Sequence, residues 1–469
     1  MVVPSKRRVA VVGGGGFRTP RLLYGLFRHA AVLGLETVVL YDQDEARARV
    51  MARLGAALGE AMPEGPSLNI ELATELDEAV RGASWVLLTI RPGGEAARVA
   101  DEQVSLRCGV LGQETVGPGG FFLALRTLPV ISRLVSSIRA VNPQAWIINF
   151  SNPVGIVSEA MATAGERRFI GVCDTPHHLK QELARFLNVE PDALRVETVG
   201  LNHLGWFLAL WQGERDWLPY LLEHWSQLAA RVRPLSFFTD TEIDAAGALP
   251  TEYVYLYQHA EDAARRIKID ATRGIQVARR SAAFFQEAET LTGCASGAAL
   301  LDRYLVSLAG RSNSYFQAET GTAVLRGLTP ETILATESYE RVAIDTMQGL
   351  VGRLHGQPVL NVPHSGAAGF LLPDQAVMEL ACRVDPSGPV AIPITRPATA
   401  SMRSLIQALK RYEVATAAAA RASSEEAAIA ALALNPVVGN RDLAASLVRQ
   451  RGIPPREAWT DASVSFNLP

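Results

Sequence analysis

The chain has 469 residues, of which 48% are hydrophobic and 20% are charged, and its formal net charge is −3 at pH 7. That length allows two or three domains with a large buried core. The nearly balanced charge creates no basic surface, so we expect no nucleic-acid partner. Since no stretch approaches 18 uninterrupted apolar residues, we also expect no membrane span.

The cysteines and the amino-terminal residues indicate a reducing compartment. Cys108, Cys173, Cys294 and Cys382 are widely spaced and form no Cys-x-x-Cys pair, which argues against a disulfide framework. The apolar run that follows the basic residues at the start of the sequence is too short for a signal peptide. We therefore expect a cytoplasmic α/β protein.

The first 200 residues alternate apolar runs with helical patterns. The runs predicted to be strands are 7–12, 36–42, 83–90, 145–150 and 167–174, and the first helical pattern covers 19–33. Nearly continuous Val, Ile and Leu runs between helices are typical of a parallel sheet covered on both faces. Residues 1–200 are thus predicted to form a Rossmann-type, doubly wound NAD-binding domain.

The rest of the chain has a mainly helical pattern. Amphipathic stretches cover 216–233, 253–266 and 275–292, a strand-like segment covers 358–373, and an alanine-rich helical segment covers 401–435. Alanine has the highest helix propensity, so the last segment is predicted to be a packed helix. Residues 201–469 are predicted to form a mixed, largely helical domain for substrate binding and oligomerisation.

A glycine run follows the first strand. Gly13, Gly14, Gly15 and Gly16 let the backbone approach a pyrophosphate, and the helix that follows supplies free N–H groups at its start. Asp42 ends the next strand, where an acid binds a ribose diol and favours NAD over NADP. The alternative is a plain tight turn.

Polar side chains follow several of the other predicted strands. Arg91 lies just past a strand end in a Pro-Gly-Gly loop, and Arg98 and Arg107 follow it. Guanidinium groups at this edge suit a phosphate or a carboxylate, although Arg107 equally fits a solvated surface position. Asn149 and Asn152 lie at the end of the strand predicted at 145–150. They either bind a substrate hydroxyl or cofactor ribose, or form the turn.

Two further segments carry metal-ligand chemistry and a candidate base. Cys173 and Asp174 end one strand, and Asn202 and His203 lie near the end of another apolar segment. A thiolate and an imidazole suit a divalent transition metal, with a buried structural Cys and a core His as the alternative. Tyr253 begins an aromatic series that equally fits a core stripe, yet a tyrosine acts as a general base when cations or a metal lower its pKa.

Together these motifs resemble glycoside hydrolase family 4, the NAD- and divalent-metal-dependent glycosidases, which depart from two-carboxylate chemistry. The resemblance rests on "GGGG..TP", "IRPGGEAARVADE", "GQETVGPGG", "NFSNPVGIVSEA", "GVCD.P", "GLNHLGW", "LP..Y", "LNVPHSG" and "LP..AVMEL". It runs nearly from end to end. The most similar subgroup is the 6-phospho-β-glucosidases.

The resemblance implies roles for individual residues. Cys173 and His203 match the metal ligands, usually of manganese, and Tyr253 matches the base that removes the proton on carbon 2 of the sugar. Asn152 matches a substrate-contacting asparagine, and Arg91 falls where the family places a phosphate-binding arginine. In the family mechanism NAD⁺ takes a hydride from carbon 3, the metal polarises the resulting ketone, elimination and water addition follow, and the hydride returns.

Three positions leave the substrate open. Gly16 replaces a serine that helps to bind phosphate in the family, and Arg18 replaces an aromatic residue. Arg18 either compensates with its charge or marks an unphosphorylated substrate. Asp174 matches an acid associated with catalysis in 6-phospho-α-glucosidases, whereas many β-enzymes carry asparagine. Asn202 is predicted to be a further substrate contact.

Two other classes of function stay as alternatives. A lactate- or malate-type NAD dehydrogenase shares the glycine-rich start but uses no Cys–His metal pair. A non-catalytic sensing relative is disfavoured because Cys173, His203 and Tyr253 are all present. The resemblance also implies a homodimer or homotetramer that acts on a small (phospho)glycoside.

Overall fold

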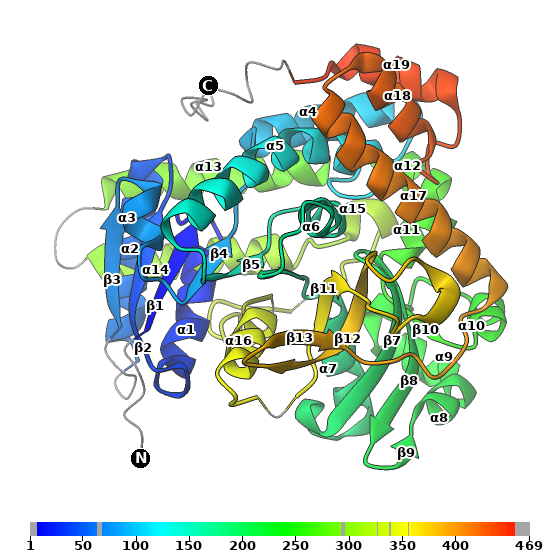
Figure 1. Cartoon of the computed structure of the whole chain (residues 1–469), viewed down its shortest axis with the longest axis horizontal. Helices are drawn as coiled ribbons and strands as arrows, with labels where there is room; N and C mark the ends of the chain where they lie inside the picture. The colour runs from blue at the N-terminus through cyan, green and yellow to red at the C-terminus, as the bar shows by residue number, and fades with distance from the viewer. Residues whose placement is uncertain are drawn as a thin grey trace.

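The computed structural model describes residues 7–62, 68–291, 296–325, 327–336, 339–354 and 356–454. Cys294 lies outside the described residues. The main element is a nine-stranded sheet with the order β13-β12-β11-β6-β5-β4-β1-β2-β3 (Figure 1). Its strands are β1 (Arg7–Val12), β2 (Leu35–Tyr41), β3 (Asn69–Ala73), β4 (Trp85–Leu88), β5 (Trp146–Asn149), β6 (Phe169–Val172), β11 (Val359–Pro363), β12 (Val377–Asp385) and β13 (Gly388–Ala391).

The first six strands pair in parallel in the doubly wound order 3-2-1-4-5-6, which confirms the Rossmann-type prediction. Central strands are buried on both faces, and Val9, Val11 and Ile147 have no exposed surface. The predicted strands are all present. The sequence missed β3, a short edge strand with only one buried residue, because it lacks a continuous apolar run.

Helices connect these strands and cover the sheet. They are α1 (Thr19–Leu33), α2 (Glu45–Glu60), α3 (Leu76–Val80), α4 (Gly94–Arg107), α5 (Pro118–Val141), α6 (Val154–Thr163) and α7 (Thr175–Leu187). The predicted helix at 19–33 is confirmed, and it ends where Gly34 adopts the left-handed conformation with φ of 62°.

The helix α5 is long and apolar enough, by length and composition, to cross a membrane. In this structure it packs against α4, α6 and α17 (Ala400–Ala422), and 56% of its most apolar window is buried inside the protein. Among the described residues it is the one helix that meets these criteria.

The second half contains an antiparallel sheet that the sequence analysis did not anticipate. It consists of β7 (Leu194–Leu201), β8 (Leu204–Gln212), β9 (Arg215–Asp216) and β10 (Leu249–Pro250), and β7 and β8 form a tight hairpin. Figure 1 shows this sheet on the side of the molecule away from β1–β3. The long apolar run of β8 is buried along most of its length, which hides the alternation that identifies a strand.

The predicted helical stretches are present but several are broken. The remaining helices are α8 (Leu218–Glu223), α9 (Trp225–Arg231), α10 (Asp240–Ala246), α11 (Val254–Gln258), α12 (Ala260–Arg266), α13 (Arg273–Thr290), α14 (Ser296–Ser312), α15 (Gln317–Thr320), α16 (Tyr339–Leu350), α17, α18 (Glu425–Ala433) and α19 (Arg441–Arg451), with 3₁₀ turns at Pro191–Ala193, Arg233–Leu235 and Gly369–Leu371. The alanine-rich segment divides after α17, because Ser423 is left-handed and Ser424 caps α18.

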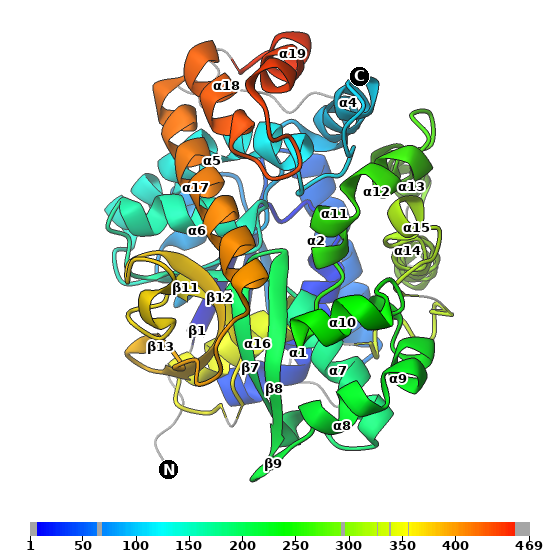
Figure 2. The same cartoon turned by 90° about the vertical axis from the view of Figure 1, so that its right-hand side faces the viewer.

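The two halves of the chain share the main sheet. The strand β11 pairs antiparallel with β6 through Leu360 opposite Val172 and Asn361 opposite Gly171. The C-terminal helices α17–α19 lie along α5 and α4 of the first half (Figure 2). A boundary at residue 200 stays a prediction, and any such boundary is crossed by backbone hydrogen bonds of this sheet.

Candidate active site

The polar residues singled out in the sequence gather where the parallel strands end. The glycine run follows β1, Asp42 follows β2, Arg91 follows β4, and Cys173 follows β6. The loops after β4 and β5 are hydrogen-bonded to each other here, since the Ile90 amide donates to Ser151 Oγ at 3.0 Å. This carboxyl edge is where ligands bind in open α/β sheets.

The glycine turn is built so that the backbone passes close to neighbouring strands. Gly13 has φ of 93°, and a Cβ on it would lie 2.4 Å from the Thr89 carbonyl oxygen. The Gly13 amide donates to the Tyr41 carbonyl at 2.9 Å, and the Gly15 amide donates to Asp42 Oδ2 at 2.8 Å. Asp42 therefore fixes the turn, and its predicted contact with a ribose stays a prediction.

The start of α1 fits a pyrophosphate. No acidic residue lies in its first turn. Thr19 Oγ1 is buried, and no described residue is its hydrogen-bond partner. A Cβ on Gly16 would lie 3.7 Å from that hydroxyl. An unused hydroxyl beside a glycine turn at a helix start suits a bound phosphate oxygen.

The asparagine that ends β5 and the one that follows the strand behave differently. Asn149 is fully buried, and its side chain donates to the Ser151 carbonyl at 3.0 Å and accepts from the Ser151 amide at 3.1 Å. It shapes the turn, and its predicted contact with the cofactor is not tested by this geometry. Asn152, which precedes a cis peptide to Pro153, has a buried Oδ1 with no hydrogen-bond partner among the described residues. That free acceptor is consistent with a substrate contact.

The arginines after β4 form an ion-pair group around one carboxylate. Arg91 Nη2 lies 2.5 Å and Arg98 Nη1 lies 3.0 Å from Glu114 Oε2, and Arg98 Nε donates to Glu102 Oε1 at 2.8 Å. These arginines hold the pKa of Glu114 well below its ordinary value, although burial opposes them. Arg107 is exposed at the end of α4, as the surface alternative predicts.

Two arginines from the second half complete this basic cluster. Arg273 Nη1 donates to the Ser314 carbonyl at 2.8 Å, and its guanidinium lies 5.3 Å from the ring centre of Tyr315. Burial, together with Arg18 and the other arginines, lowers the pKa of Arg311 to about 9. The buried Nε of Arg311 has no hydrogen-bond partner within the described ranges. The cluster thus holds a buried donor without a partner among the described residues.

Cys173 and His203 come from separate elements. Cys173 follows β6 and is buried; burial, Glu379 and Asp174 raise the pKa of its thiol well above the ordinary value. His203 occupies the β7–β8 turn with a left-handed φ of 62°. Its ring stacks on Tyr253 with centres 3.8 Å apart and planes 4° apart. Burial lowers the pKa of His203 to about 4, so the imidazole is neutral at pH 7, as a metal ligand must be.

This donor set fits a transition metal that also takes ligands from its substrate. No group of three or more His, Cys, Asp or Glu side chains suited to a metal is found among the described residues. A thiol and a neutral imidazole are donors for such ions. Cys173 and His203 are thus two candidate ligands among the described residues, which leaves other coordination positions for substrate or water oxygens.

Tyr253 lies at the centre of the site. Its ring is buried between His203 and Phe316, whose ring centre is 5.0 Å away at an edge-on angle. The Tyr315 hydroxyl donates to the Tyr253 hydroxyl at 2.9 Å. Burial and Glu114 raise the pKa of Tyr253 well above its ordinary value. A tyrosine in this state needs a partner group to act as a base.

Two buried carboxyl groups of this site were missed in the sequence. Glu379 Oε1 accepts hydrogen bonds from Asn202 Nδ2 at 3.0 Å and from Asn361 Nδ2 at 2.9 Å. Glu252 precedes Tyr253, and burial raises its pKa to about 8. Both acids stand inside motifs that the sequence analysis quoted, "LP..AVMEL" and "LP..Y". Tyr315 had no signal, because only the fold brings it to Tyr253.

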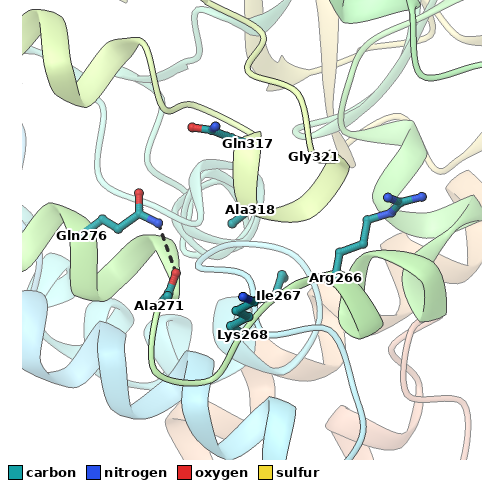
Figure 3. Close-up of a pocket in the computed structure, with 8 residues that line it drawn as sticks. All are labelled: Arg266, Ile267, Lys268, Ala271, Gln276, Gln317, Ala318 and Gly321. Carbon is teal, nitrogen blue, oxygen red and sulfur yellow. Dashed lines mark hydrogen bonds between the residues drawn. The ribbon is translucent and has the colours of Figure 1, made fainter.

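A separate, open pocket of about 380 Å³ lies between α12, the start of α13 and α15 (Figure 3). Gln276, on one wall, donates to the Ala271 carbonyl at 3.1 Å. None of the site residues described above lines it. Its lining residues are Arg266, Ile267, Lys268, Ala271, Gln276, Gln317, Ala318 and Gly321.

The doubly wound sheet and the glycine turn at its edge define a nucleotide-binding α/β fold, in which a thiol, an imidazole and a phenol are buried. Residues 8–189 match the family 4 glycosyl hydrolases, and residues 198–438 match the C-terminal domain of the same family. The chain belongs to glycosyl hydrolase family 4. It is therefore a glycosidase, which confirms the resemblance and removes support from the dehydrogenase alternative.

Relatives of this chain have both anomeric specificities. A probable 6-phospho-beta-glucosidase of Bacillus subtilis (strain 168) is 26% identical, with 94% of each chain covered. A phospho-alpha-glucosidase of Clostridium acetobutylicum is 35% identical over 47% of this chain and 50% of its own. The structure of a Thermotoga maritima 6-phospho-beta glucosidase with manganese, NAD⁺ and glucose-6-phosphate is 24% identical, with a TM-score of 0.76 over 95% of this chain and 98% of that one.

Proposed function

We propose that the protein hydrolyses 6-phosphorylated glucosides, with preference for the β anomer, using NAD and a divalent metal. The basic cluster carries the phosphate part of this proposal. Arg18, Arg98 and Arg273 all lie close enough to Arg311 to lower its pKa, and its Nε has no described partner. A phosphate oxygen beside Arg311 would supply the missing acceptor for its Nε.

The basic cluster lies beside Tyr253, the proposed base. Arg273 packs on the Tyr315 ring, and Tyr315 is hydrogen-bonded to Tyr253. Glu114, which pairs with Arg98, also influences the pKa values of Tyr253 and His203. A sugar whose phosphate occupies the cluster would therefore present its ring atoms to Tyr253. This arrangement supports compensation for Gly16 by arginines, rather than loss of the phosphate requirement.

The cofactors are proposed from the residues that fit them. The glycine turn with Thr19 Oγ1 would hold the NAD pyrophosphate, Asp42 would face the ribose, and Cys173 and His203 would hold manganese. When bound, these groups accept and return the carbon 3 hydride and polarise the carbon 3 ketone.

The chain's own residues would then orient the sugar and move protons. Asn152 Oδ1 is free to accept from a sugar hydroxyl. Tyr253 would remove the carbon 2 proton, because its hydroxyl lies in the same buried space as the metal-ligand side chains. Asp174 at the start of α7 would protonate the leaving oxygen. Burial of these groups keeps competing water out of the reaction.

The proposed β preference rests on the share of this chain that each relative matches, and Asp174 argues against it. The probable 6-phospho-beta-glucosidase matches 94% of the chain at 26% identity, whereas the phospho-alpha-glucosidase matches 47% at 35% identity. Asp174 favours the α anomer, since the family resemblance associates an acid at this position with the α-enzymes. A 6-phospho-α-glucosidase is therefore the second candidate function.

The test uses nitrophenyl α- and β-glucosides, each with and without a 6-phosphate, together with NAD⁺, Mn²⁺ and a thiol reductant. The proposal predicts cleavage of the phosphorylated β-glucoside alone, abolished by a chelator or by omission of NAD⁺. Cleavage of the phosphorylated α-glucoside alone would establish the second candidate. Cleavage of unphosphorylated sugars alone would refute the role proposed for the arginine cluster.

A further inference from the structure

We propose that Glu102 is a positioning residue that holds the arginines of the basic cluster in the arrangement that binds the 6-phosphate. This inference rests on the proposed function, because the phosphate is the ligand proposed for that cluster. Glu102 is the last residue of the motif "IRPGGEAARVADE", and the family resemblance implies no role for it. Its carboxyl group connects an arginine of the first half of the chain to a helix of the second half.

The carboxyl group of Glu102 accepts hydrogen bonds from two different helices. Arg98 Nε, one turn earlier on α4, donates to Oε1 at 2.8 Å. The Gly274 amide, in the first turn of α13, donates to Oε2 at 2.7 Å, although the two residues are 172 positions apart. Glu102 has no exposed surface. Both oxygens of a carboxyl group that water does not reach are thus occupied by protein donors.

The sequence at the start of α13 suits this contact. A Cβ on Gly274 would lie 2.5 Å from Glu102 Oε2, and its three nearest atoms would all belong to the Glu102 side chain. Glycine at this position therefore lets the carboxyl group reach the helix backbone. The first turn of α13 contains no acidic residue of its own. Glu102 thus supplies the negative charge that stabilises a helix N-terminus.

The same contact fixes Arg273, which directly precedes Gly274. Arg273 Nη1 donates to the Ser314 carbonyl at 2.8 Å, and its Nη2 donates to the Arg311 carbonyl at 3.3 Å. The start of α13 thereby holds the end of α14, where Arg311 stands. A shift of the first turn of α13 would move Arg273 and release the segment that carries Arg311.

The other hydrogen bond of Glu102 fixes Arg98. The Nη1 atom of Arg98 lies 3.0 Å from Glu114 Oε2 and 3.8 Å from Glu95 Oε2, so carboxyl groups surround the guanidinium. Loss of Glu102 would remove the one that faces its Nε. A single carboxyl group thus orients arginines from both halves of the chain, and a binding site is precise only when such supporting residues fix its side chains.

The experiment compares Glu102→Ala and Glu102→Gln with the unsubstituted enzyme in NAD⁺, Mn²⁺ and a thiol reductant. Glu102→Ala should raise KM for the 6-phosphorylated nitrophenyl glucoside about 10- to 100-fold with little change in kcat, because misplaced arginines bind the phosphate less well in ground and transition states alike. Kd for glucose 6-phosphate should rise with KM, and Kd for NAD⁺ should not change. The glutamine variant keeps one acceptor oxygen for two donors, so its rise in KM should be smaller.

The contact between Glu102 and Gly274 is also tested from its other side. Gly274→Ala places a methyl group against the carboxyl group and should raise the same KM. That collision is absent in the double variant, whose KM should therefore not exceed that of Glu102→Ala alone. The matched control is Glu159→Gln, which alters another buried carboxyl group, paired with Lys410, and should leave KM unchanged.

An unchanged KM in Glu102→Ala, or in the glutamine variant where the alanine variant does not fold, would overturn the positioning role. An equal loss of affinity for NAD⁺ and for glucose 6-phosphate would also overturn it, since a general structural defect produces that pattern. Cleavage of unphosphorylated glucosides alone by the unsubstituted enzyme would refute the proposed function, and this inference with it.

Discussion

Removal of Glu379 should destabilise the protein by an amount that its hydrogen bonds define. Glu379→Ala leaves the side-chain amides of Asn202 and Asn361 without their acceptor in a buried place. Each unsatisfied group costs about 1–3 kcal/mol, so the variant should lose about 2–6 kcal/mol. An unfolding entropy of about 2.1 cal/mol/K per residue gives about 1 kcal/mol per degree for 469 residues. The expected fall in Tm is therefore about 2–6 °C.

Calorimetry in chelator and reductant would measure this fall, with two variants for comparison. Glu379→Gln keeps an acceptor oxygen and should lose less than about 1 kcal/mol. Glu214→Ala, in an exposed turn, controls for loss of a carboxylate. An unchanged Tm for Glu379→Ala, or an equal fall for the glutamine variant, would refute the role given to these hydrogen bonds.

Four further outcomes are expected. Arg311→Met should raise KM for the 6-phosphorylated glucoside about 10- to 100-fold, from a loss of about 1.5–3 kcal/mol, whereas Arg107→Ala at an exposed site should not. Burial raises the pKa of Glu252 from 4.5 to about 8, so the unsubstituted protein should lose stability as the pH rises through this range. Urea titrations between pH 5 and pH 9 should show a smaller loss for Glu252→Gln than for the unsubstituted protein. The difference should be at most about 5 kcal/mol, at about 1.4 kcal/mol per pKa unit. Gly13→Ala should abolish NAD⁺ binding in a fluorescence titration, because its methyl group would collide with the Thr89 carbonyl. Cys173→Ser should weaken Mn²⁺ binding, read by electron paramagnetic resonance, at least about 10-fold.

Local sequence patterns predicted the parallel sheet and the edge of it at which ligands are expected to bind. The strands around Val9 and Ile147 are continuous apolar runs, and their burial requires such runs. Cys173, placed after an apolar run, lies at the strand end for the same reason. Glu379 escaped prediction because its partner Asn202 is 177 residues away. No periodicity records a contact at that separation, so the fold had to supply it.

The arginines show a second limit of sequence patterns. A loop position suggested a ligand role for Arg91, yet its guanidinium already contacts Glu114 in this structure. Arg273 and Arg311, which complete the basic cluster, stand in helical segments whose spacing resembles any packed helix. The net charge of a site comes from side chains on several helices and loops, which meet only after folding. A single segment therefore does not reveal it.

The shared sheet also governs how the chain can be divided. The strand β6, which leads into Cys173, is bordered by β11, a strand that follows it by almost 190 residues. Pairing across such a separation forms late and slowly during folding. A fragment that stops near residue 200 would leave β6 as an open, apolar edge, and such edges recruit other chains. An expressed first half should therefore aggregate, and half-length pieces of this enzyme are poor tools for studying its nucleotide binding.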